Sequence, residues 1–122
     1  MSLKVLVVDD SGVMRKIIIR SLNALGVTDI VEAGDGGEAL EKFKAQSCDM
    51  VLTDWNMPVK TGIELAQDIR ALGSQVPIVM ITTEAEKSHV LKAIQAGVND
   101  YLTKPFENDV LREKLTKFCV AV

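Results

Sequence analysis

The feature that most constrains the fold of this chain is the alternation of short β-branched apolar runs with stretches of helical period. The runs predict strands at residues 4–8, 30–33, 50–53, 78–81 and 101–102. Such alternation is typical of parallel βαβ units with right-handed crossovers. The first, third and fourth runs are continuously apolar, as expected when helices cover both faces of a sheet. The sequence therefore predicts an α/β fold with a doubly wound parallel sheet.

After each run, apolar side chains recur at helical spacing and predict five helices. The marker residues are Met14, Ile17, Ile18, Leu22 and Leu25; Ala39, Leu40 and Phe43; Leu65, Ala66, Ile69 and Leu72; Val90, Ala93 and Ile94; and Leu111, Leu115 and Phe118. Ser11 is expected to cap the first helix and Gly26 to end it. Residues 34–37 are expected to form a turn before the second helix.

Length and composition narrow the possible classes of protein. A chain of 122 residues suits one domain with a real core. The net charge of −3 argues against wrapping of nucleic acid, and no apolar stretch is long enough to span a bilayer. Without a signal segment the expected location is cytoplasmic, so Cys48 and Cys119 are expected to be reduced. The lone His89 lies in a polar stretch and is expected to be a solvated surface residue.

Chemically capable side chains follow four of the predicted strands. Asp9 and Asp10 follow the first, Asp54 the third, Thr82 the fourth and Lys104 the fifth. In an open parallel sheet the carboxyl ends share one edge, where active sites lie. Each group alone has an ordinary explanation as a turn, cap or solvated residue. Their coincidence at four strand ends favours a site.

Three carboxylates in one pocket repel each other, so they stay ionised together only beside a cation. An all-oxygen ligand set suits Mg²⁺, or alternatively Mn²⁺, rather than zinc. Mg²⁺ uses one or two carboxylates, which leaves another free to attack phosphorus and form an aspartyl-phosphate. Lys104 could neutralise the transferring group and Thr82 could hydrogen-bond it.

Longer motifs around these positions resemble the receiver domains of two-component response regulators. The motifs are residues 7–11, 54–58, 61–65, 81–84 and 96–106, and the likeness covers essentially the whole chain. Within that family the chain is most similar to the stand-alone chemotaxis regulators. The resemblance implies one flavodoxin-like receiver domain over residues 1–122, without an effector domain. Its five-stranded sheet would have the order 2-1-3-4-5 and be covered by five helices.

The resemblance also implies a metal site and a phosphoacceptor. Asp54 would accept a phosphoryl group from a phosphohistidine on a sensor histidine kinase. Mg²⁺ would be held by Asp10, Asp54 and the backbone carbonyl of Asn56, with Asp9 acting mostly through a metal-bound water. Lys104 would contact the phosphoryl group.

The same resemblance implies a conformational switch. Thr82 would move to hydrogen-bond the phosphoryl group, and Tyr101 would follow it from an exposed to a buried rotamer. The Lys104–Pro105 bond would be cis. The last two helices and the strand between them would carry the output surface.

The predicted function is thus a phosphorylation-activated signalling module with intrinsic autophosphorylation and autodephosphorylation, rather than an enzyme. The expected partners are a sensor histidine kinase of the chemotaxis type and, for motor control, a flagellar motor switch protein and a phosphatase. Neither nucleic-acid binding nor membrane insertion is expected, and a monomer is the default. A single-domain phosphorelay regulator and an excised receiver of a larger protein remain open. A Mg²⁺-dependent aspartyl-phosphate phosphatase is less favoured, because Asn56 stands where such enzymes have a second aspartate.

Overall fold

The computed structural model describes residues 3–55, 57–83 and 87–118. Within them a five-stranded sheet has the order β2-β1-β3-β4-β5, and each neighbouring pair is parallel. The strands are β1 (Lys4–Val8), β2 (Asp29–Ala33), β3 (Met50–Thr53), β4 (Ile78–Thr82) and β5 (Asp100–Thr103). All five lie where the apolar runs predict them, with four strand ends extended by one residue each. The predicted strand order is confirmed.

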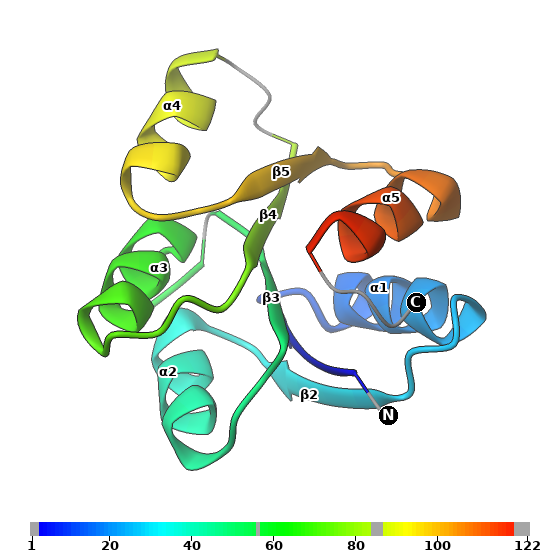
Figure 1. Cartoon of the computed structure of the whole chain (residues 1–122), viewed down its shortest axis with the longest axis horizontal. Coiled ribbons are helices and arrows are strands. Elements are labelled where there is room, and N and C mark those ends of the chain that lie inside the picture. The colour runs from blue at the N-terminus through cyan, green and yellow to red at the C-terminus, as the bar shows by residue number, and fades with distance from the viewer. Residues whose placement is uncertain (1–2, 56, 84–86, 119–122) are drawn as a thin grey trace.

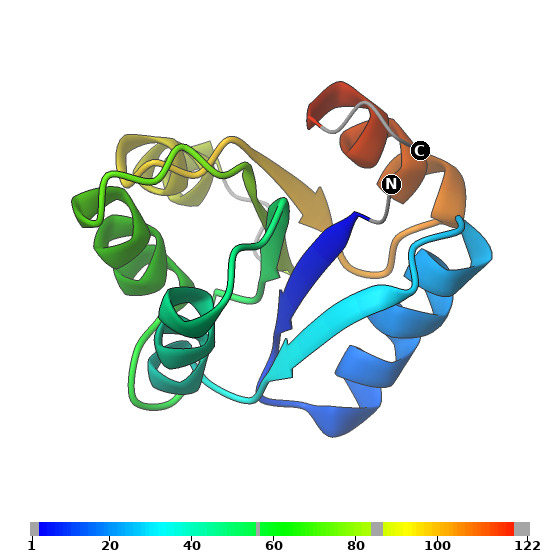
Figure 2. The ribbon, with the colours of Figure 1, turned by 60° about the horizontal axis from the view of Figure 1, so that its bottom comes forward.

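Helices cover both faces of this sheet, which makes a three-layer sandwich (Figures 1 and 2). They are α1 (Gly12–Ala24), α2 (Gly36–Ala45), α3 (Gly62–Ala71), α4 (Lys87–Gln95) and α5 (Asn108–Phe118). Helices α1 and α5 lie on one face, and α2, α3 and α4 lie on the other. The right-handed crossover rule accounts for this division, since the connections reverse direction beside β1.

Two apolar cores lie on the two faces of the sheet, and β1 contributes to both. Val5 and Val7 pack with the buried residues of α1 and α5, whereas Leu6 and Val8 pack with those of α2, α3 and α4. Alternate side chains of a strand point to opposite faces. A strand that is buried on both faces must therefore be continuously apolar, which is why the sequence of β1 shows no alternation.

The helix ends follow from their sequences, with one correction. The Ser11 side chain accepts the Met14 N–H at 3.2 Å and caps α1, as predicted. The predicted turn over residues 34–37 is too long, because α2 already begins at Gly36. Asp35 caps that helix by accepting the Glu38 N–H at 2.7 Å. A Cβ at Gly36 would lie 2.4 Å from the Lys60 carbonyl oxygen, so the glycine permits a close approach of two loops rather than a turn.

Several expectations concern single residues. The Lys104–Pro105 bond is cis, as predicted. Cys48 is half-buried against the core. Asn56, Cys119 and the side chain of His89 lie outside the described part of the chain. No helix in the described ranges has the length and apolar character needed to cross a membrane.

Candidate functional site

The carboxyl ends of β1 and β3 bring three acidic side chains together. Val8 is paired with Thr53 in the sheet, so Asp9 and Asp54 follow at the same level. The Asp54 N–H donates to the Val8 carbonyl at 2.9 Å and continues the pairing beyond the strands. Carboxylate oxygens of Asp9, Asp10 and Asp54 all lie within 4.8 Å of one another. The predicted convergence of these residues is therefore present.

Asp9 is buried, and hydrogen bonds hold both its side chain and its backbone. Its Oδ1 accepts the Ser11 N–H at 2.9 Å, and its Oδ2 accepts from Lys104 Nζ at 2.9 Å. The Asp9 N–H donates to the Ala33 carbonyl at 3.2 Å, and the Asp9 carbonyl accepts from Arg15 Nη1 at 2.6 Å. A buried carboxylate needs such partners to stay ionised. Asp9 is thus fixed from β2, α1 and the loop after β5.

Asp54 is the half-buried member of the cluster, and its surroundings disfavour its charge. Burial is the largest influence and raises the pKa of Asp54, and the nearby Asp9 raises it further. Lys104 and a hydrogen bond from the Trp55 N–H lower the pKa, but the net shift is upward. Both of these donors approach Oδ1, with Trp55 N at 2.8 Å and Lys104 Nζ at 3.5 Å. Within the described residues, Oδ2 is therefore the oxygen left for further chemistry. An additional cation would favour the ionised form.

Lys104 supplies positive charge to two of the three carboxylates. Its side chain is 12% exposed and its Nζ bridges Asp9 and Asp54. The Lys104 N–H also donates to the Thr82 carbonyl at 2.9 Å, which keeps the loop after β5 beside β4. The sequence predicts a lysine that faces a phosphoryl group, and here the same ammonium pairs with the carboxylates. It is the cation that their mutual repulsion requires.

The loop between β3 and α3 wraps closely around Asp54. The Gly62 N–H donates to the Trp55 carbonyl at 2.9 Å, and a Cβ at Gly62 would lie 2.2 Å from the Asp54 carbonyl oxygen. Val59 has φ 70°, and the Lys60 N–H turns back to the Pro58 carbonyl at 2.7 Å. Positive φ is strained for a β-branched residue. This tight path holds the loop against the end of β3.

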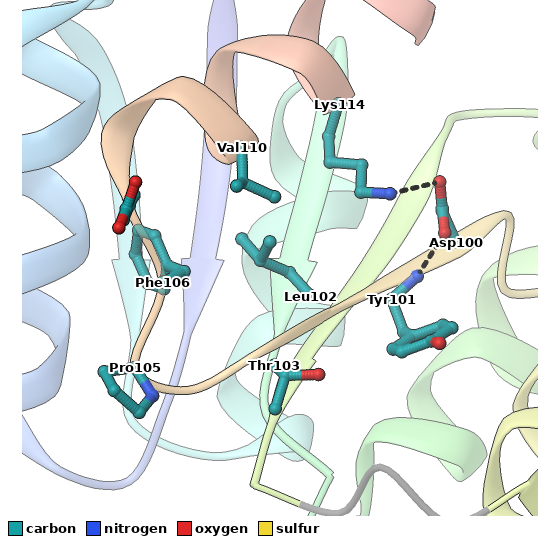
Figure 3. Close-up of a pocket in the computed structure, with 9 residues that line it drawn as sticks. Asp100, Tyr101, Leu102, Thr103, Pro105, Phe106, Val110 and Lys114 are labelled. Atoms are coloured by element: carbon teal, nitrogen blue, oxygen red, sulfur yellow. Dashed lines mark hydrogen bonds and ion pairs between the residues drawn. The ribbon is translucent and has the colours of Figure 1, made fainter.

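Thr82 and Tyr101, the predicted switch residues, lie on neighbouring strands. Thr82 is buried at the end of β4, beside Thr103 of β5. Tyr101 lies on β5 with 37% of its surface exposed. Figure 3 shows its ring on one side of the strand and Leu102 on the other, pointing toward Phe106. Tyr101 therefore occupies the exposed position from which the predicted movement would start.

A pocket of about 640 Å³ lies between β5 and α5, and Tyr101 and Lys114 are among its lining residues (Figure 3). Asp100 closes one end, with its Oδ2 at 3.0 Å from Lys114 Nζ and 3.2 Å from Lys117 Nζ. Burial raises the pKa of Asp100, but hydrogen bonds from Lys114, the Tyr101 N–H and Lys117 lower it more, so the net pKa is lowered. These ion pairs attach α5 to β5.

Comparison with protein families matches residues 5–116 to the response regulator receiver domain. The chain belongs to the response regulator receiver family. Chemotaxis protein CheY1 of Helicobacter pylori strain J99 is 50% identical over 116 residues, which cover 93% of this receiver and 94% of the relative. Chemotaxis protein CheY of Pseudomonas aeruginosa PAO1 is 44% identical over 117 residues, 94% of each chain. This receiver is homologous to CheY regulators, which is consistent with a phosphorylation-activated signalling switch.

Solved structures show the same fold. Chemotaxis protein CheY4 of Vibrio cholerae superposes on this receiver with a TM-score of 0.90 at 33% identity, over 97% of this chain and 99% of that chain. The receiver domain of the sensor histidine kinase PA1611 from Pseudomonas aeruginosa PAO1 has a TM-score of 0.88 at 32% identity and covers 97% of this chain and 98% of its own. That structure is described as having a magnesium ion coordinated in the active site cleft.

Two features of this receiver's site were not predicted from sequence. The first is the double role of Lys104 as the partner of Asp9 and Asp54, which depends on the rotamer of a long side chain. The second is Arg15, whose guanidinium reaches the Asp9 carbonyl. A signal for Arg15 was present, because a cation in the first turn of a helix opposes the helix dipole and calls for another explanation.

Proposed function

We propose that this receiver accepts a phosphoryl group on Asp54 from a histidine kinase and uses it to change its output surface. The observation that carries the proposal is the position of Asp54, half-buried, beside two further carboxylates and the Lys104 ammonium. Asp9 has both oxygens in hydrogen bonds and is 1% exposed, which makes it a poor nucleophile. Asp54 Oδ2 is the better candidate to attack phosphorus.

We propose Mg²⁺, or Mn²⁺, as the cofactor of this site. The three clustered carboxylates fit a hard divalent ion. Burial raises the pKa of Asp54, and a bound cation would favour its ionised form. Asp10 and Asp54 would ligate the metal, Asp9 would act through water, and the Asn56 carbonyl is a further predicted ligand. The magnesium ion in the PA1611 receiver domain supports this assignment. When bound, the ion supplies charge neutralisation at the phosphoryl oxygens.

The chain's own residues would then divide the remaining work. Asp54 Oδ2 forms the O–P bond as the N–P bond of the phosphohistidine breaks, and the departing imidazole keeps the bonding electron pair. Lys104 turns toward the phosphoryl oxygens, and the buried Thr82 hydroxyl donates to one of them. Tyr101 follows Thr82 inward and changes the surface formed by α4, β5 and α5. Loss of the phosphoryl group to water resets the switch.

We propose a role in chemotaxis, supported by identities of 44–50% to CheY and CheY1 proteins over most of the chain. A chemotaxis-type sensor kinase would then be the phosphodonor. A flagellar motor switch protein and a phosphatase are further expected partners, and the site of action would be the cytoplasm. Phosphotransfer should run faster from a chemotaxis kinase than from an unrelated sensor kinase, whereas equal rates would favour a phosphorelay role.

The central test is labelling by acetyl phosphate. With Mg²⁺ present, intact-mass analysis should show a phosphate adduct on wild type and on the control Asp109→Asn, whose aspartate lies exposed on α5. Asp54→Asn should show none, and EDTA should abolish the wild-type adduct. Equal labelling of Asp54→Asn and wild type would reject Asp54 as the acceptor.

A second test separates phosphorylation from switching. Lys104→Ala should still accept phosphate by the same mass assay, because Asp54 and the other acidic ligands remain. It should fail to change the fluorescence of Trp55, the only tryptophan of the chain, which follows the phosphoacceptor directly. A normal fluorescence response in this variant would show that the lysine does not transmit the signal.

A further inference from the structure

Arg15, near the start of α1, connects the residue that follows β1 to the neighbouring strand β2. Its Nη1 donates to the Asp9 carbonyl at 2.6 Å, and its Nε donates to Glu32 Oε1 on β2 at 3.1 Å. The side chain is 23% exposed. Its guanidinium nitrogens also lie 3.5–3.6 Å from ideal Cβ positions at Gly12 and Gly34, so it fills the space between the loops.

The local environment on α1 does not account for this arginine. It lies in the first turn of the helix, where the dipole favours anions, and that turn has no acidic residue. A cation in the first turn is unfavourable for the helix. The compensating contacts are the hydrogen bond to Asp9 and the ion pair with Glu32. The contacts of Arg15 with Asp9 and Glu32 therefore explain why a cation occupies this position.

The Asp9 carbonyl that accepts from Arg15 belongs to the peptide unit between Asp9 and Asp10. A peptide unit is planar, so fixing the Asp9 carbonyl also fixes the N–H and Cα of Asp10. The Asp10 carboxylate is exposed and receives no hydrogen bond or ion pair from the described residues, unlike those of Asp9 and Asp54. Since no contact with a described residue orients this side chain, its backbone position alone sets the region that the carboxylate can reach.

We propose that Arg15, braced by Glu32, is a positioning residue that aims the Asp10 carboxylate at the divalent cation. This inference rests on the proposed metal site. Groups that orient metal ligands through a hydrogen bond typically contribute a factor of about 10–100 to metal affinity. Removal of the Arg15 side chain should therefore weaken Mg²⁺ binding by about tenfold.

The sign of the effect distinguishes positioning from simple electrostatics. A guanidinium near three carboxylates repels a divalent cation, so loss of its charge alone would tighten Mg²⁺ binding. Positioning predicts the opposite sign. Arg15→Lys keeps the charge and one donor and should regain part of the affinity.

The test is a Mg²⁺ titration followed by Trp55 fluorescence, on wild type, Arg15→Met, Arg15→Lys and the control Arg20→Met. Arg20 is an exposed arginine of α1, so its variant changes net charge equally without touching Asp9. We expect a Kd about tenfold higher for Arg15→Met, an intermediate value for Arg15→Lys and less than a twofold change for Arg20→Met. At saturating Mg²⁺, labelling of Arg15→Met by acetyl phosphate should approach the wild-type rate.

Unchanged or tighter Mg²⁺ binding by Arg15→Met would overturn the inference and leave the proposed function intact. Failure of wild type to bind Mg²⁺ at all would instead overturn the proposed metal site. If Arg15→Met does not fold, Glu32→Ala provides the test, because it removes the acceptor that braces Arg15 while Arg15 remains. A Kd raised severalfold in that variant supports positioning, and an unchanged Kd refutes it.

Discussion

Lys104→Met tests whether the Lys104 ammonium stabilises the fold by offsetting the repulsion among the acidic side chains when no metal is bound. Methionine retains an unbranched apolar side chain of similar length but removes the ammonium. In wild type that ammonium lies 2.9 Å from Asp9 Oδ2 and 3.5 Å from Asp54 Oδ1. The substitution therefore leaves two carboxylates close together without their shared partner.

The magnitude follows from the burial of those groups. At about 3 Å and an effective dielectric constant of about 20, each attraction is about 5 kcal/mol before desolvation is subtracted. Removal of one partner from a buried pair typically destabilises a protein by about 3–5 kcal/mol. Asp9 keeps the Ser11 N–H and Asp54 is only half-buried, so we expect the lower limit, about 3 kcal/mol. For a domain of this size that corresponds to a Tm lower by about 10 °C.

The assay is thermal unfolding in EDTA and then in Mg²⁺, with the exposed Lys44→Met as a control for loss of one charge. Lys44→Met should unfold close to wild type in both conditions. Mg²⁺ should raise the Tm of Lys104→Met by more than that of wild type, because the cation no longer competes with an ammonium. A variant as stable as wild type in EDTA, or one that gains less from Mg²⁺, would refute this role for the lysine.

Five further substitutions test the site and its surroundings. The pKa of Asp54 is raised, so its ionised form opposes folding. Asp54→Asn should therefore raise the Tm in EDTA at neutral pH. This gain should disappear at a pH below the ordinary carboxyl pKa, where the aspartate is protonated in both the folded and the unfolded state. The pKa of Asp100 is lowered, so its ionised form stabilises the fold and Asp100→Asn should lower the Tm at neutral pH. In urea titrations, the difference in stability between wild type and this variant should be lost as pH falls through the lowered pKa. In urea titrations, Gly62→Ala should destabilise the fold by about 2 kcal/mol, because the added Cβ would lie 2.2 Å from a backbone oxygen. Gly12→Ala is the matched control, also at a helix start but with its nearest contact at 3.5 Å, and it should be neutral or stabilising by up to about 1 kcal/mol. Val59→Gly should relieve positive-φ strain and raise stability by up to about 1 kcal/mol, and a lower urea midpoint would contradict the strained turn.

Strand positions were predictable from this sequence because sheet burial imposes a pattern on each run, whereas the strand order was predicted from the resemblance to receiver domains. Val5 to Val8 must satisfy two cores at once, and that requirement leaves a continuous apolar run that the sequence displays. The convergence of Asp9 and Asp54 then follows from parallel pairing alone, since neighbouring strands end at the same edge. The pairing of the strands therefore accounts for this part of the site without any knowledge of side-chain rotamers.

The remaining details depend on contacts between residues far apart in the sequence. The start of α2 at Gly36 is signalled locally by the cap Asp35 and by Glu38 three residues later, but the need for glycine at position 36 comes from the close approach of the Lys60 backbone. The reach of Arg15 to the Asp9 carbonyl and of Lys104 to its carboxylate depends on rotamers fixed by packing. Sequence patterns carry little information on such choices, and the movement of Tyr101 stays a prediction.

The ion pair between Lys104 and Asp9 joins residues 95 positions apart in the chain. A growing polypeptide therefore displays its acidic residues well before their ammonium has been synthesised. Until β5 docks on β4, the first strands end in carboxylates with no basic group from the C-terminal segment beside them. The lysine on which the proposed switching depends is thus added only with the final strand–helix unit, so a nascent or C-terminally truncated chain would lack the group proposed to transmit the signal.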